Sequence, residues 1–184
     1  DVSGKGISAA LLMSNFQANL RALFTHEIAL TKLAEKLNER VMATAKGEKF
    51  ITIFIGRYNL QKHHLEYINA GHNPPLLYNK FSKQMNQLTS GCVGLGMLDE
   101  IPVMNVGSIL INQPSKLICF TDGLVEFLSD NKIENGTKAI ESDISNSLPL
   151  NENIAHIIET HSQQSENNNI VLFDDISILG LEFL

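Results

Sequence analysis

Three acidic motifs, spread from the start of the chain to its end, limit the folds that are open to this sequence. They are Asp1-Val2-Ser3-Gly4-Lys5-Gly6, Cys119-Phe120-Thr121-Asp122-Gly123 and Phe173-Asp174-Asp175-Ile176-Ser177. Each places an aspartate where a strand is expected to end or to meet a turn. A fold that brings these aspartates together creates a cluster of oxygen ligands, which suits Mg²⁺ or Mn²⁺ better than Zn²⁺, an ion that prefers cysteine and histidine.

The second and third motifs also have a simpler interpretation. Asp-Gly after a strand is commonly a turn, and Asp-Asp between two strands is commonly the end of a hairpin. The first motif lacks the spacing of glycines and lysine that defines a phosphate-binding loop. The metal-site hypothesis therefore depends on the three motifs occurring together.

The composition is that of an ordinary globular domain. The 184 residues are 43% hydrophobic and 18% charged, and no apolar run approaches the roughly 18 residues of a membrane span. The formal net charge of −6 argues against a nucleic-acid partner, which would require clustered lysine and arginine. Cys92 and Cys119 lack the spacing of a metal site, so we expect reduced thiols in a cytoplasmic protein.

The periodicity of the apolar residues predicts two helices within residues 8–45 and a series of strands within residues 50–121. Two consecutive helices followed by many strands indicate an α+β fold, with helices packed on two antiparallel sheets. The predicted helices span residues 8–23, 27–45, 138–144 and 154–160, and the predicted strands span 50–56, 65–69, 76–78, 84–88, 104–111 and 116–121. Residues 162–169 are wholly polar and are expected to be disordered. Residues 170–173 and 176–184 are expected to form a closing hairpin around Asp174-Asp175.

The motifs, together with two further blocks, resemble a known family. The blocks are Asp1–Ile7 followed by Ala9–Met13, Asn69–Leu77, Gly91–Gly96, Phe120–Glu126 and Asp174–Ser177. In this order they resemble the metal-dependent serine/threonine phosphatases of the SpoIIE/RsbU branch, which belong to the type 2C (PPM) superfamily. The blocks cover nearly the whole chain, so the resemblance applies to residues 1–184 as one phosphatase domain.

The resemblance implies a site for two Mn²⁺ or Mg²⁺ ions in a two-sheet core flanked by helices. In that comparison Asp1 matches the bridging carboxylate, Val2 a backbone carbonyl ligand, and Asp122 and Asp174 the other carboxylate ligands. The implied supporting residues are Ser3, Gly4, Gly123, Asp175 and His72. Asp175 is expected to position the site, and His72 to hold its turn through hydrogen bonds. Two roles remain open for Glu126: it either acts near the metals or is a solvated residue of a helix.

Two departures from the family pattern affect the expected chemistry. The family carries a Gly-Asp-x-x-Asp motif upstream of the first block, so the chain is expected to be incomplete at its N-terminus, with an incomplete metal site. Many eukaryotic relatives carry histidine where this chain has Ser3, so the leaving group would take its proton from a metal-bound water.

The resulting prediction is a cytoplasmic phosphoserine/phosphothreonine phosphatase domain without a side-chain nucleophile. The resemblance implies a phosphorylated anti-sigma-factor antagonist as substrate and an upstream sensor domain, and a homodimer is a further option. The alternative is a non-catalytic module that keeps the fold and regulates a partner by binding it. The first helix of the pair that spans about residues 7–45 begins within a few residues of Asp1 and Val2, so we expect this pair to regulate the site as well as to form core.

Overall fold

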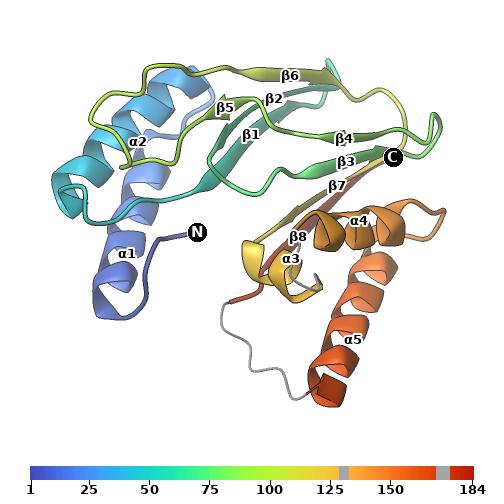
Figure 1. Ribbon diagram of the computed structural model, residues 1–184. Helices are drawn as coiled ribbons and strands as arrows, with labels where there is room; N and C mark the ends of the chain where they lie inside the picture. The colour runs from blue at the N-terminus through green and yellow to red at the C-terminus, as the bar shows by residue number, and fades with distance from the viewer. Residues whose placement is uncertain (129–132, 169–174) are drawn as a thin grey trace. The chain divides into compact units, whose positions relative to one another are not determined.

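The computed structural model describes residues 1–128, 133–168 and 175–184, which contain five helices and eight strands (Figure 1). They form two compact units, which we call the first unit and the second unit. The first unit comprises Asp1–His72 and Thr89–Leu110, and the second comprises Asn73–Leu88 and Ile111–Leu184. Each unit has its own sheet and its own hydrophobic core. The predicted α+β class with two sheets and helices is confirmed.

The first unit opens with two long helices, α1 (Ile7–Leu23) and α2 (Leu30–Ala45). Both were predicted from apolar periodicity, although α2 begins slightly later than expected. The buried residues of α2 recur every three or four positions and therefore form one face of the helix. They are Leu30, Leu33, Ala34, Leu37, Asn38 and Val41. α2 ends where Lys46 adopts a left-handed conformation and its N–H bonds the carbonyl of Met42.

The sheet of the first unit is built on a hairpin. β1 (Ile53–Asn59) pairs antiparallel with β2 (His64–Ala70), which also pairs with β5 (Gly91–Cys92) and β6 (Gly107–Leu110). The side chain of Asn59 accepts hydrogen bonds from the amides of Gln61 and Lys62, and this stabilises the turn at the predicted position. β1 begins and ends later than the predicted strand 50–56, because residues 50–52 belong to a different pairing described below.

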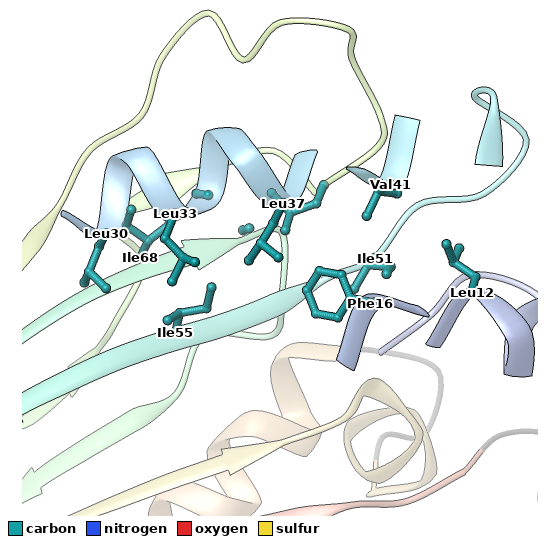
Figure 2. Packing of buried hydrophobic residues seen from close by; sticks show 12 residues of the cluster. Leu12, Phe16, Leu30, Leu33, Leu37, Val41, Ile51, Ile55 and Ile68 are labelled. Carbon is teal, nitrogen blue, oxygen red and sulfur yellow. The ribbon is translucent and has the colours of Figure 1, made fainter. Parts of the chain in front are cut away.

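The core of the first unit lies between its helices and this sheet. Figure 2 shows Leu33 and Leu37 of α2 pointing toward Ile55 of β1 and Ile68 of β2. All four side chains are buried. Burial of each such side chain stabilises the fold by about 1.5–3 kcal/mol relative to its exposure.

The second unit holds an antiparallel sheet with strand order β4-β3-β7-β8. Its strands are β3 (Leu76–Asn79), β4 (Met85–Gln87), β7 (Ser115–Phe120) and β8 (Ile178–Phe183), and its helices are α3 (Asp122–Leu128), α4 (Ile133–Ile144) and α5 (Leu150–Asn168). Side chains of β3, β7 and all three helices form one buried cluster, which includes Leu76, Ile118, Leu124, Ile140 and Ile157. None of the helices in the described ranges is both long and apolar enough to cross a membrane.

The C-terminal part of the described chain differs in part from the predicted elements. Residues 162–168, which were predicted to be disordered, instead extend α5 to Asn168. Polar residues can continue a helix that is already nucleated. The predicted strand 170–173 lies outside the described residues. The predicted strand 176–184 exists as β8, and its partner in the structure is β7.

A lysine lies in the interior of the second unit. Lys116 of β7 is fully buried, and its Nζ donates to oxygens at the end of α4, in the following turn and on α5. The acceptors are the carbonyls of Ile144 (3.1 Å) and Asn146 (3.0 Å) and the Oδ1 atoms of Asn146 (3.3 Å) and Asn153 (2.6 Å). Burial lowers the pKa of Lys116 below its ordinary value, and the acceptors offset part of the cost of burying the ammonium group.

Candidate functional site

The first acidic motif lies beside residues 50–52 in the first unit. Val2 forms an antiparallel bridge with Ile51. The bonds of this bridge run from the Ser3 amide to the Phe50 carbonyl and from the Thr52 amide to the Asp1 carbonyl, each 2.9 Å long. Because the residues on either side of Val2 make these bonds, the carbonyl of Val2 faces away from Ile51. That carbonyl is the one predicted to bind metal, and the Asp1 residue beside it is exposed.

Ile51 is paired on its other side with the glycine-rich block. Its N–H and C=O exchange hydrogen bonds of 2.8 Å each with the backbone of Leu95. Residues 1–3, 50–52 and 94–96 therefore lie as three adjacent backbone segments with Ile51 in the middle. Both Ile51 and Leu95 are buried. The block Gly91–Gly96 thus supports the segment that carries Asp1 and Val2.

A sharp turn connects the first motif to α1. Gly4 and Gly6 adopt φ values of 81° and 84°, a left-handed conformation that side chains disfavour. A Cβ atom on Gly4 would lie 2.5 Å from Nζ of Lys49, which itself donates to the Ser3 carbonyl at 3.4 Å. The positive φ of Gly4 therefore favours glycine at this position of the turn.

His72 and Thr52 lie beside the first motif. The His72 amide donates to Oδ1 of Asn69 at 2.8 Å, and Nδ1 of its ring lies 3.4 Å from Oγ1 of Thr52. Thr52 also bonds the backbone of Asp1. The predicted site did not include Thr52, although it is the polar residue that interrupts an otherwise apolar run, and this signal could have identified it.

The second and third acidic motifs meet in the second unit. The hydroxyl of Thr121 donates to the Asp175 carbonyl at 3.0 Å and accepts from the Ser177 amide at 2.9 Å, and the Thr121 amide donates to the Ser177 carbonyl at 3.1 Å. Asp122 follows directly and opens α3, a helix that the sequence did not predict. Its carboxylate is exposed, and Oδ1 accepts a 3.0 Å bond from the Gly123 amide. Asp174 lies outside the described residues.

The predicted ligand set offers oxygen atoms only. Within the described ranges, no group of three or more His, Cys, Asp or Glu residues is placed to hold a metal ion. Burial raises the pKa of the Cys92 thiol and raises the pKa of the Cys119 thiol to about 11, so burial favours the protonated form of both. The chemistry of the exposed aspartates and the Val2 carbonyl fits Mg²⁺ or Mn²⁺.

Comparison with known proteins places the chain in a family. The family described as stage II sporulation protein E (SpoIIE) matches residues 1–184. Phosphoserine phosphatase RsbU of Bacillus subtilis (strain 168) is 30% identical over 131 residues, which cover 71% of this chain and 39% of RsbU. The chain spans between 32% and 39% of the length of the curated relatives that it matches.

Solved structures share the fold. The RsbU and RsbW domains of Rv1364c from Mycobacterium tuberculosis match with a TM-score of 0.71 and 23% identity, over 98% of this chain and 50% of that chain. The catalytic domain of the serine threonine protein phosphatase PstP, solved in complex with 2 manganese ions, matches with a TM-score of 0.67 and 14% identity, over 98% of this chain and 84% of that chain.

The two sheets and their helices form the fold seen in solved PP2C-type phosphatase structures. The chain belongs to the SpoIIE family, as its motifs predicted.

Proposed function

We propose that this chain is the phosphatase domain of a cytoplasmic signalling protein and hydrolyses phosphoserine or phosphothreonine on a protein substrate. The observation that supports this most directly is the meeting of two acidic motifs at the end of β7, where Thr121 joins Asp122 to the segment that begins with Asp175. The proposed ligands for two Mn²⁺ or Mg²⁺ ions are the carboxylates of Asp1, Asp122 and Asp174 and the carbonyl of Val2. When bound, such a pair supplies an activated water and neutralises the phosphoryl oxygens.

The chain's own residues hold these ligands in place. The Gly123 amide orients the Asp122 carboxylate through its bond to Oδ1. The Asp175 carbonyl ties the third motif to Thr121, which is consistent with a positioning role for Asp175. The Ser3 hydroxyl accepts a hydrogen bond from the Phe50 amide at 2.8 Å, which supports a role in holding the first segment.

Similarity to relatives supports a proposal for the substrate and the partners. RsbU is a phosphoserine phosphatase, and we propose a phosphorylated anti-sigma-factor antagonist as the protein substrate here. An upstream sensor domain, or a second copy of the chain, would act through α1, which begins shortly after Ser3. The net charge of −6 gives no support for a nucleic-acid partner.

Removal of divalent metal tests the proposed reaction. EDTA should abolish the release of phosphate from a phosphoserine peptide by the full-length protein, and added Mn²⁺ should restore it, because no side-chain nucleophile replaces the metal-bound water. Phosphate release is measured with a malachite green assay, with Ca²⁺ as the control ion. Hydrolysis that continues unchanged in EDTA would contradict the metal mechanism.

The non-catalytic module remains the second candidate. It predicts that the protein binds a phosphorylated partner without releasing phosphate at any Mn²⁺ concentration. A binding measurement beside the phosphate assay separates the two functions.

A further inference from the structure

One buried polar side chain interrupts the apolar face of α2. Asn38 is 3% exposed and lies among the buried hydrophobic residues of the helix, next to Leu37. A buried amide without hydrogen bonds destabilises a core by about 1–3 kcal/mol. An asparagine at this position therefore needs specific partners.

All partners of Asn38 lie in one loop. Its Nδ2 donates to the carbonyls of Leu98 (3.0 Å) and Asp99 (3.2 Å), and its Oδ1 accepts from the amide of Gly96 (2.8 Å). The side chain thus uses both amide hydrogens and its oxygen to hold residues 96–99. These residues belong to no helix or strand of the structure, so Asn38 substitutes for the hydrogen bonds of a regular element.

The contact between α2 and this loop is close. Gly96 adopts φ 88°, and a Cβ atom there would lie 2.4 Å from Cγ1 of Val41, one turn along α2 from Asn38. The loop therefore rests directly on the helix. A shift of the loop relative to α2 requires the bonds of Asn38 to break.

The same loop supports the first acidic motif. Leu95 precedes Gly96 and exchanges two backbone bonds with Ile51, and Ile51 is bridged to Val2. Neighbouring backbone segments in such a ladder lie about 4.8 Å apart. A continuous series of hydrogen-bonded segments thus leads from Asn38 to the carbonyl of Val2 and the carboxylate of Asp1. Figure 2 shows the middle of this region, where Val41 of α2 lies close to Ile51.

We propose that Asn38 is a positioning residue for the metal ligands Asp1 and Val2, acting through the loop 95–99 and Ile51. This inference rests on the proposed function for the identity of the ligands. An apolar residue of similar size would serve the core of α2 equally well, so the three hydrogen bonds are what the asparagine adds. Asn38 of α2 and the turn at Gly4 then both hold Asp1 and Val2 in position.

Two variants of the full-length protein test the inference. Asn38→Leu fills the volume but leaves the loop without its partners. Asn38→Ser keeps a hydroxyl that can bond within its own helix, so it serves as a folded variant if Asn38→Leu does not fold. Leu30→Ala is the matched control, because it weakens the core of the same helix at its other end without touching residues 95–99.

Two readouts separate positioning from stability. The affinity for Mn²⁺, measured by calorimetry, should fall about tenfold in the Asn38 variants, the lower end of the effect of residues that orient metal ligands. In the metal-free Asn38 variants, the amides of Ser3 and Thr52, which form the hydrogen bonds of the bridge, should lose protection from hydrogen exchange. At saturating Mn²⁺, kcat should return toward that of the wild type, with KM for the phosphopeptide unchanged.

Specific outcomes would overturn the inference. Wild-type protection of Ser3 and Thr52 in both Asn38 variants would show that the loop does not hold the first motif. An equal loss of Mn²⁺ affinity in Leu30→Ala would show that the effect is only one of stability. Failure of the wild-type protein to bind Mn²⁺ or to hydrolyse phosphoserine would refute the proposed function, and with it the ligand role, whereas the exchange measurement would still decide whether Asn38 positions the segment.

Discussion

Replacing Asp122 by asparagine should lower kcat/KM for a phosphoserine peptide by a factor on the order of 10² or more. The change keeps the size of the side chain and the acceptor for the Gly123 amide, so the fold should be preserved. It removes the charge that the proposed metal ions require. Loss of residues that merely orient metal ligands already costs roughly 10–100-fold in affinity or activity, and a ligand itself should cost at least as much.

A nearby residue supplies the control for this experiment. Glu141 lies on α4 in the same unit and accepts a 3.2 Å bond from Gln87. Glu141→Gln removes one negative charge from the same unit without touching the acidic motifs. Its kcat/KM should stay within about twofold of the wild type, since the charge of this partly exposed residue contributes little. Equal losses in the two variants, or none in Asp122→Asn, would mean that Asp122 is not a ligand.

Replacing Lys116 by methionine should destabilise the second unit more than any surface substitution. The methionine keeps the apolar stem but leaves the carbonyls of Ile144 and Asn146 and the side chain of Asn153 without their donor. Hydrogen bonds from a charged group contribute about 1.5–3 kcal/mol each, partly offset by the cost of burying the ammonium. We expect a loss of about 3 kcal/mol, which corresponds to about 6–12 °C in Tm for a protein of this size.

Lys80, in the turn that follows β3, provides a matched substitution in the same unit. Its Nζ bonds Glu182 at 3.0 Å, but both side chains are partly exposed, at 27% and 23%. Such a pair contributes roughly 0–1 kcal/mol, so Lys80→Met should lower Tm by no more than about 4 °C. Thermal unfolding followed by circular dichroism compares the two. If Lys116→Met unfolds at the same temperature as Lys80→Met, the buried lysine does not stabilise the junction of α4 and α5.

Local patterns in the sequence predicted the elements that depend on local interactions. The two long helices of the first unit and the hairpin turn near Asn59 followed from periodicity and turn residues. The short helix α3 was missed because seven residues are too few to establish a helical period. The polar end of α5 was mistaken for disorder because composition does not report a helix that begins upstream.

The features of the site that depend on pairing between distant segments could not be predicted from the sequence. The motifs predicted which residue types belong to the site, but the bridge between Val2 and Ile51 joins segments far apart in the chain, and no local signal marks it. The same holds for Asn38, whose partners lie in the loop after Leu95. The available signal was an asparagine among the regularly spaced apolar residues of a helix. It indicated that the side chain has a buried hydrogen-bond partner, but it did not identify that partner.

The division of the chain into two units has a consequence for its synthesis. All the described residues of the first unit have been made once Leu110 has been added. By then β3 and β4 of the second unit already exist, but β3 lacks its partner β7, and β7 in turn pairs with β8 near the other end of the chain. Until those strands emerge from the ribosome, one edge of the β3–β4 hairpin stays open, with Leu76 and Tyr78 uncovered. The growing chain is therefore most exposed to aggregation in the interval between Leu110 and β8.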